Sequence, residues 1–282
     1  MQCQEIVLLW YKQHGRKLPW RETIDPYKIL VSEMMLQQTQ VERVIHKYHT
    51  FLEKFPTVHS LVEISPAEVL RYWSGLGYNR RALYLQKCAQ ALVQKKEFPQ
   101  TVEELQTLPG IGAYTAAAVL SFALNKDVVV IDVNIELLFK RIFYPRKDVE
   151  VIAKKILPQG HSRDWHNALM DIGALYCTAK NPKCSSCPLK NSCTSANDSK
   201  KIEATWLKKN VKTFKSSDRI VRGGILKLLT KKDGQNIEKL WITLDEQGIQ
   251  RSKEVFSSIL RKLEKDGLVV VKREKVSLPA KA

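Results

Sequence analysis

The sequence contains no apolar run that approaches the roughly 20 residues needed to span a membrane as a helix. Its first segment, MQCQEIVLLWYKQHGRKLPW, reaches charged residues too early for a secretory signal peptide. There is no internal repeat and no low-complexity tract, and 44% hydrophobic with 27% charged residues excludes the disordered and fibrous classes. We therefore expect a folded cytoplasmic protein that does not associate with membranes.

The sequence has far fewer acidic than basic residues. The chain has 29 Asp and Glu against 46 Lys and Arg, which gives a formal net charge of +17. This charge favours a polyanionic partner. Because the basic residues are spread along the whole chain and are not gathered on one amphipathic helix, nucleic acid fits better than a membrane surface. The alternative is a solvated basic surface without a partner.

Short helices are predicted for most of the chain. From Glu5 to about Cys193, apolar residues recur at helical spacing, with Pro or Gly between the segments. Pro26 opens one helical segment that extends to residue 55. The run DVVVI (127–131) has the composition of a strand but no strand-like neighbour, so we expect an extended connection there.

The chain of 282 residues is long enough for one sizeable domain and a small one, since single cores stop growing at roughly 250 residues. After Cys193 the composition becomes that of a linker. In the second domain, we expect a helix and a short strand (KLWITL) within residues 219–244, followed by an amphipathic helix over Ser252–Asp266. The segment LVVVKREKVSL predicts two strands joined by a tight turn. This order is typical of a small α+β winged-helix module.

Four of the six cysteines are clustered. Cys177, Cys184, Cys187 and Cys193 lie close together in the sequence, while Cys3 and Cys88 stand apart. A reducing cytosol keeps thiols available as thiolate ligands, so the cluster indicates a metal site more than a disulfide framework.

Two glycines precede a helix of small residues in LPGIGAYTAAAVLSFAL (108–124). Gly110 and Gly112 allow backbone amides to converge at the helix N-terminus, where they can bind a phosphate oxygen without a side chain in the way. An ordinary tight turn between two helices is the alternative.

Several motifs in order resemble the endonuclease III superfamily, and within it the MutY-type adenine glycosylases. LPGIG followed by a helix and Asp132 is similar to the hairpin and catalytic aspartate of that superfamily. CTAKNPKCSSCPLKNSC has the C-x6-C-x2-C-x5-C spacing of its [4Fe–4S] loop. The similarity runs from about residue 16 to 193 and includes four further motifs: LPWR (18–21), SEMMLQQTQV (32–41), GLGY (75–78) and NALMDIGALYC (167–177).

The resemblance implies a mainly α protein with the helix-hairpin-helix glycosylase fold, and a [4Fe–4S] cluster on the four clustered cysteines, with a zinc site as the alternative. It also implies the order of the domains. A glycosylase region covers 1–196, with a six-helix barrel over about 20–128 and an iron–sulfur subdomain over 1–19 and 129–196. A linker (197–217) and the winged-helix-like domain (218–282) follow.

The resemblance also assigns catalytic roles. Tyr114 stands where relatives that also cut the strand have a lysine for Schiff-base chemistry, so this chain is expected to be monofunctional. Glu33, in an apolar segment that raises its pKa, would protonate N7 of adenine, and Asp132 would stabilise the sugar cation. Asn134 and Tyr114 would order the sugar and water. Purely structural roles are the alternative, for Asp132 that of a helix N-cap.

Residues for DNA and base recognition follow from the same motifs. Gln37 and Gln38, with Leu36 beside them, would fill the gap left by an everted base; core-facing polar side chains are the alternative. Asn167 stands where the family often has a glutamine that faces adenine.

Two departures concern the opposite base. Tyr78 matches the family's GLGYY pattern, but Asn79 replaces the second tyrosine, which stacks beside 8-oxoguanine. The C-terminal region resembles a winged helix instead of the family's β-rich domain that helps to read this base.

The sequence therefore predicts a monomeric DNA base-excision glycosylase that acts on duplex DNA with a mismatch or lesion, at the nucleoid. It would hydrolyse the bond between adenine, mispaired with guanine or 8-oxoguanine, and its sugar. One alternative is a glycosylase for thymine or uracil opposite guanine. A more remote one is a non-catalytic iron–sulfur regulator that binds DNA.

Overall fold

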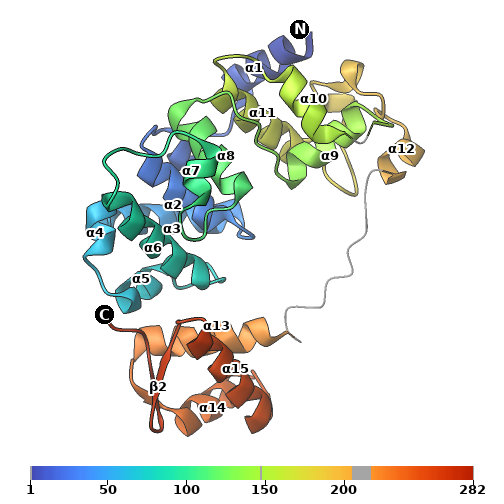
Figure 1. Ribbon diagram of the computed structural model, residues 1–282. Helices are drawn as coiled ribbons and strands as arrows, with labels where there is room; N and C mark the ends of the chain where they lie inside the picture. Colours follow the sequence, from blue (N-terminus) through green and yellow to red (C-terminus); the bar gives the residue numbers. More distant parts are fainter. Residues whose placement is uncertain (1, 147, 205–216, 282) are drawn as a thin grey trace. The chain divides into compact units, whose positions relative to one another are not determined.

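The computed structural model describes residues 2–146, 148–204 and 217–281, and these are helical almost throughout (Figure 1). They fall into two compact units. The first lies within Met1–Glu33, Pro99–Thr107 and Ile111–Lys209, and the second within Met34–Phe98, Leu108–Gly110 and Asn210–Ala282. The domain boundaries predicted from the sequence stay a prediction.

The first unit contains most of the residues assigned to chemistry. Its helices are α1 (Gln2–His14), the 3-10 turn η1 (Pro19–Arg21), most of α2 (Pro26–Leu36), α7 (Val102–Gln106), α8 (Ala113–Leu124), α9 (Val133–Ile142), α10 (Val149–Ile156), α11 (Ser162–Leu175), the 3-10 turns η2 (Cys184–Ser186) and η3 (Lys190–Ser192), and α12 (Ser199–Ala204).

Helix α11 is central to this unit, because it packs against α1, α8 and α9. Its buried face carries Trp165, Leu169 and Ile172, which join Trp10 of α1 and Phe139 of α9 in one hydrophobic core. These three positions on α11 are four and three residues apart, so they lie along one side of the helix. This core fixes the start of α9, where Asp132 lies.

Local sequence signals account for several helix ends. Thr101 and Glu104 form a reciprocal capping box at α7, and Asp132 caps α9. Helix α8 ends at Asn125, which has the left-handed φ of 50° that asparagine tolerates better than most residues.

The second unit contains four helices of the N-terminal half of the chain and the C-terminal module. The helices are α3 (Val41–Lys54), α4 (Val58–Val62), α5 (Pro66–Trp73) and α6 (Arg80–Val93). Helix α6 packs against α4 and α5. The module contains α13 (Asp218–Lys231), β1 (Gln235–Asn236), α14 (Ile237–Glu246), α15 (Lys253–Lys265), β2 (Val270–Lys272) and β3 (Lys275–Ser277).

The C-terminal module is built as a small winged helix. Its three strands form an antiparallel sheet in the order β1-β3-β2, in which Val276 of β3 pairs with Gln235 and with Val271. Helix α13 packs on α14 and α15. The predicted fold class, mainly α with a small C-terminal α+β domain, is confirmed.

Two local predictions were wrong. The segment KLWITL is part of helix α14, because Asn236 caps the helix through the amides of Glu238 and Lys239, and Leu240 and Leu244 are buried one turn apart. The segment opened by Pro26 is two helices, α2 and α3, since the chain turns between them at Gln38, whose φ is 55°.

One other expectation was met. Residues 127–131 form an extended connection without strand pairing, as the lack of a strand-like neighbour predicts. Among the helices that the structure describes, each is too short or too polar to cross a membrane. The predicted linker, 197–217, lies outside the described residues from 205 to 216.

Candidate active site

The helix-hairpin-helix turn between α7 and α8 uses its two glycines differently. Gly110 has a φ of +80°, and a Cβ on it would lie 2.5 Å from the Cβ of Tyr84, so the turn requires glycine there. Gly112 precedes α8 in extended backbone and is exposed, and a Cβ on it would meet nothing within 4 Å. Gly112 therefore leaves the amide end of α8 open. Phosphate binding at these glycines stays a prediction.

Glu33 and Tyr114 meet inside the first unit. Glu33, on α2, is 5% exposed, and the hydroxyl of Tyr114, in the first turn of α8, donates a hydrogen bond to its carboxyl group. The pKa of Glu33 is raised from 4.5 to about 7. Burial is the largest cause and the nearby charge of Asp132 adds to it, while the hydrogen bond from Tyr114 and the charge of Arg21 oppose the rise. Glu33 therefore keeps a proton near neutral pH.

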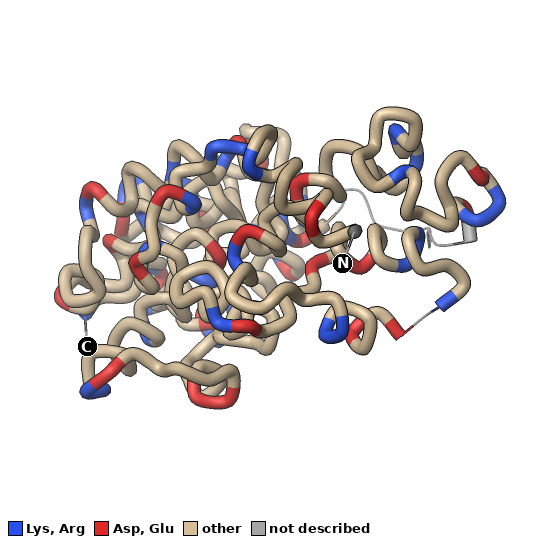
Figure 2. The backbone as a smooth tube through the Cα atoms, turned by 90° about the horizontal axis from the view of Figure 1, so that it is seen from above, with Lys and Arg blue, Asp and Glu red and all other residues tan. Residues whose placement is uncertain are grey.

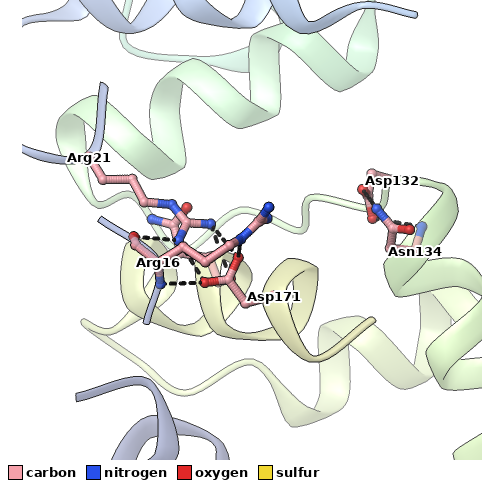
Figure 3. A network of polar contacts seen from close by, with 6 residues as sticks. Arg16, Arg21, Asp132, Asn134 and Asp171 are labelled. Carbon is pink, nitrogen blue, oxygen red and sulfur yellow. Dashed lines mark hydrogen bonds and ion pairs between the residues drawn. The ribbon is translucent and has the colours of Figure 1, made fainter. Parts of the chain in front are cut away.

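Asp132 is held in place by the start of α9 (Figure 3). Its Oδ1 accepts hydrogen bonds from the backbone amides of Asn134 at 3.0 Å and Ile135 at 2.7 Å, and its Oδ2 accepts one from Nδ2 of Asn134 at 2.8 Å. Burial raises the pKa of Asp132, while these three bonds favour the carboxylate and lower it. Asp132 is thus the N-cap of α9. The charge of its carboxylate also acts on Glu33.

Two close contacts of α11 fix the positions of Asn134 and of the segment that leads to Asp132. A Cβ on Gly173 would lie 2.8 Å from the Cβ of Asn134, so the absence of a side chain lets α11 approach the start of α9. His166 accepts a hydrogen bond from the amide of Val130 at 3.1 Å through Nε2, while its Nδ1 lies 2.7 Å from the carbonyl oxygen of Ser162. Burial lowers the pKa of His166 to about 4, so it is neutral at physiological pH. His166 thereby anchors the extended segment that leads to Asp132.

Leu36, Gln37 and Gln38 lie at the end of α2, in the second unit. Leu36 and Gln37 are half-buried and Gln38 is exposed. Their backbone is fastened by Arg81 of α6, which is 7% exposed and donates to the carbonyl oxygen of Gln37 at 2.6 Å and to that of Met34 at 2.7 Å. The sequence did not reveal this role, because nothing in the local pattern of Arg81 marks it as a buried cation.

Arg81 also organises the loop that carries Tyr78 and Asn79. It donates to the carbonyl oxygen of Gly77 at 3.0 Å, and its guanidinium lies 5.4 Å from the centroid of the Tyr78 ring. Tyr78 has a φ of 46° and is 41% exposed, whereas Asn79 is half-buried just before α6. The guanidinium of Arg219 lies 5.3 Å from the same ring and donates to the Tyr78 hydroxyl at 2.8 Å. The roles of Tyr78 and Asn79 in base recognition stay predictions.

Asn167 is buried on α11, with 6% exposure, and its backbone carbonyl oxygen accepts a hydrogen bond of 3.4 Å from Nη2 of Arg21. Contact with adenine through its side chain stays a prediction.

The four clustered cysteines line one pocket, together with Leu138, Arg141 and other residues of the loop and α9. Arg141, 2% exposed, donates to Sγ of Cys177 at 3.4 Å and to the carbonyl oxygens of Thr178 and Ala179, both at 2.8 Å. In the part of the chain that the structure describes, no three His, Cys, Asp or Glu side chains are grouped to hold a single metal ion. The donor set fits a [4Fe–4S] cluster, since four cysteine thiolates around one pocket are the ligands that such a cluster takes.

Comparison with known proteins agrees with this arrangement. The family model described as "HhH-GPD superfamily base excision DNA repair protein" matches residues 31–159, and that described as "Iron-sulfur binding domain of endonuclease III" matches 177–193. The adenine DNA glycosylase of Mycolicibacterium smegmatis is 38% identical over 79% of this chain and 78% of its own. The chain belongs to the adenine DNA glycosylase family. The predicted [4Fe–4S] cofactor is likewise supported, and the four clustered cysteines lie within the matched residues 177–193; their role as its ligands stays a prediction.

Other relatives show how far the family likeness extends. The adenine DNA glycosylase of Buchnera aphidicola subsp. Baizongia pistaciae is 41% identical over 74% of this chain, which spans 62% of that protein. Among solved structures, a thermostable thymine-DNA glycosylase has a TM-score of 0.64 at 28% identity, over 68% of this chain and 94% of its own. An endonuclease III trapped covalently on DNA has a TM-score of 0.60 at 26% identity, over 69% and 94%. This member of the family thus shares the endonuclease III fold.

Proposed function

We propose that this protein is a monofunctional DNA glycosylase that hydrolyses the bond between a mispaired adenine and its deoxyribose and leaves an abasic site. The observation that carries the proposal is the hydrogen bond from the Tyr114 hydroxyl to the Glu33 carboxyl group, together with the Asp132 carboxylate, whose charge acts on Glu33. Burial raises the pKa of Glu33 to about 7, which provides an acid that is still protonated near neutrality. The family membership of the chain supports adenine as the base.

These groups account for each proton and electron pair of the hydrolysis. Glu33 gives its proton to N7 of adenine, and the bond between C1′ and N9 breaks with its electron pair passing to the base. The Asp132 carboxylate stabilises the cationic sugar that remains. A water oxygen then bonds to C1′ and its proton returns to the Glu33 carboxylate.

Tyr114 separates this chemistry from that of strand-cutting relatives. A Schiff base requires an amine, and Tyr114 supplies a phenol in the first turn of α8. Burial raises the pKa of Tyr114 well above its ordinary value of 10.0, so the phenol stays a donor to Glu33 across the working pH range. Asn134 completes the site by holding Asp132.

The iron–sulfur cluster has a structural place in this proposal. Cys177, Cys184, Cys187 and Cys193 would hold it, and when bound it supplies a four-point thiolate cross-link for the loop after α11. Arg141 supports the loop from α9 through the carbonyl oxygens of Thr178 and Ala179.

Duplex DNA with a mismatch or lesion is the proposed partner, and a monomer the proposed active form. Lys and Arg residues are distributed over the chain (Figure 2), and the sequence has 46 of them against 29 Asp and Glu. We assign Gly110 and Gly112 to the phosphate of the damaged strand, and Leu36, Gln37 and Gln38 to the gap left by the everted base.

Thymine or uracil opposite guanine is the second candidate substrate. It is favoured by the likeness to the thymine-DNA glycosylase and by Asn79, which lacks the ring that could stack on 8-oxoguanine. Adenine and pyrimidine release would share Glu33, Tyr114 and Asp132, so the substrate has to be measured.

Single-turnover excision on four duplexes separates the candidates. The duplexes carry A opposite 8-oxoguanine, A opposite G, T opposite G, or U opposite G in one sequence context. The proposal predicts release of adenine, with strands that break only after alkali treatment. Release of pyrimidines alone would establish the second candidate. No release of any base by protein that binds DNA would support a regulator.

A further inference from the structure

Ser195 lies in the turn that follows the last cysteine of the cluster loop, and it is the buried serine of that region. It is 1% exposed, whereas Ser185, Ser186 and Ser192 of the same loop are exposed. Its Oγ is shielded from solvent and has no hydrogen-bond partner among the residues that the structure describes. Because buried hydroxyl groups are nearly always hydrogen-bonded, the Ser195 hydroxyl calls for an explanation.

The hydrogen bonds of the turn itself leave the Ser195 hydroxyl out. Thr194 joins the turn to the end of α9: its amide donates to the carbonyl oxygen of Ile142 at 3.1 Å, and its Oγ1 donates to that of Tyr144 at 3.1 Å. The carbonyl oxygen of Ser195 accepts a hydrogen bond from the amide of Asp198 at 3.2 Å. The turn is therefore held by its backbone and by Thr194, and these bonds give the Ser195 hydroxyl no structural role.

Ser195 lines the pocket that the four clustered cysteines share. Leu138, Ile142 and Leu189 also line it, and their side chains offer no acceptor to a hydroxyl. The backbone amide of Ser195 donates to Sγ of Cys193, so the residue lies beside this cysteine. Sulfur is thus the acceptor that this pocket presents to the Ser195 side chain.

Two other cysteines of the pocket also accept hydrogen bonds at sulfur. Nη1 of Arg141 donates to Sγ of Cys177 at 3.4 Å, and the backbone amide of Leu189 donates to Sγ of Cys187. Hydrogen bonds to the sulfur atoms are among the properties that set the reduction potential of an iron–sulfur cluster. A further donor beside Cys193 would act on the same property.

We propose that the Ser195 hydroxyl donates a hydrogen bond to a sulfur atom of the bound [4Fe–4S] cluster, beside Cys193, and thereby raises the reduction potential of the cluster. One-electron reduction adds negative charge to the sulfur atoms. A hydrogen bond to a more negative acceptor is stronger, so the donor stabilises the reduced state more than the oxidised state. The inference rests on the proposed ligation of the cluster by the four clustered cysteines.

The test measures the reduction potential of the purified holoenzyme by protein-film voltammetry, without DNA. Ser195→Ala removes the hydroxyl and keeps the backbone amide that donates to Cys193. Ser192→Ala is the matched control, because Ser192 is an exposed serine that directly precedes the same cysteine. Iron and sulfide contents are determined first, so that only chains with a complete cluster are compared.

Ser195→Ala should shift the reduction equilibrium of the cluster about tenfold toward the oxidised state, as loss of one hydrogen bond to a charged acceptor does. For one electron, this lowers the potential by about 59 mV. Ser192→Ala should keep the wild-type potential. Equal potentials in Ser195→Ala and wild type, both with a complete cluster, overturn the inference, and so does an equal fall in Ser192→Ala.

Resonance Raman spectroscopy of the holoenzyme supplies a readout that altered packing alone would not change. A hydroxyl proton bound to sulfur makes the Fe–S stretching bands sensitive to the exchange of water for D2O. This isotope shift should be smaller in Ser195→Ala than in wild type and in Ser192→Ala. The same shift in all three proteins would show that the Ser195 hydroxyl does not bind sulfur.

Neither measurement uses a substrate, so this inference and the proposed function fail separately. A lower potential in Ser195→Ala supports the role of Ser195 even if wild type releases no adenine, a result that would refute the proposed function alone. Wild-type protein that releases adenine but holds zinc and no iron would refute the role of Ser195 and leave the proposed reaction standing.

Discussion

Replacing Glu33 with glutamine should stabilise the protein at alkaline pH while it abolishes excision. Burial raises the pKa of Glu33 from 4.5 to about 7. Between these values the folded state binds more protons than the unfolded state, so stability falls as pH rises through this window. A shift of about 2.5 units corresponds to about 3 kcal/mol, all of it lost above pH 7. Glutamine carries no charge and avoids this loss.

Thermal unfolding at two pH values measures the effect. At pH 8.5 Glu33→Gln should be about 3 kcal/mol more stable than wild type, which is roughly 5–10 °C in Tm for a chain of this size. At pH 5, where Glu33 is neutral in the folded protein, the gain should shrink below about 1 kcal/mol. Glu150→Gln, at an exposed position on α10, removes the same charge and is the control.

Two results would refute this reasoning. A Tm difference between Glu33→Gln and wild type that is equal at both pH values would mean that Glu33 titrates normally. A pH-dependent gain in Glu150→Gln of the same size would mean that net charge, and not burial of one carboxyl, is responsible.

Three further predictions concern the rest of the site. Asp132→Asn should keep the N-cap and the Tm, but it loses the charge that stabilises the sugar cation, so single-turnover excision should slow by about 100- to 1,000-fold. A rate within tenfold of wild type would contradict this role. Gly110→Ala should cost about 1–3 kcal/mol of stability, because φ is +80° and Tyr84 is 2.5 Å from the added carbon, whereas Gly112→Ala should keep the Tm and weaken DNA binding in a titration. Tyr114→Lys should form a complex with abasic DNA that borohydride traps, and wild type should not.

Short-range chemistry was readable from the sequence. The cysteine spacing, the two hairpin glycines and the N-cap of Asp132 depend on neighbours within a few residues, and the structure places each as the local pattern requires. The apolar segment around Glu33 likewise predicted its burial, and the residue is 5% exposed.

Contacts between residues far apart in the sequence could not be predicted from it. KLWITL has β-branched and aromatic residues at its centre, and packing of Leu240 and Leu244 overrode that preference. Arg81 and Arg21 look like surface cations in the sequence. Their burial depends on carbonyl groups and a carboxylate that lie 40 to 150 positions away, such as Asp171 for Arg21.

The protonation state of Glu33 tests the central claim most directly. In wild-type protein, carbon-13 NMR of its carboxyl carbon should give a titration midpoint near pH 7, as burial beside Asp132 requires. A midpoint near 4.5, the ordinary value for glutamate, would leave the site without an acid at neutral pH and contradict the account.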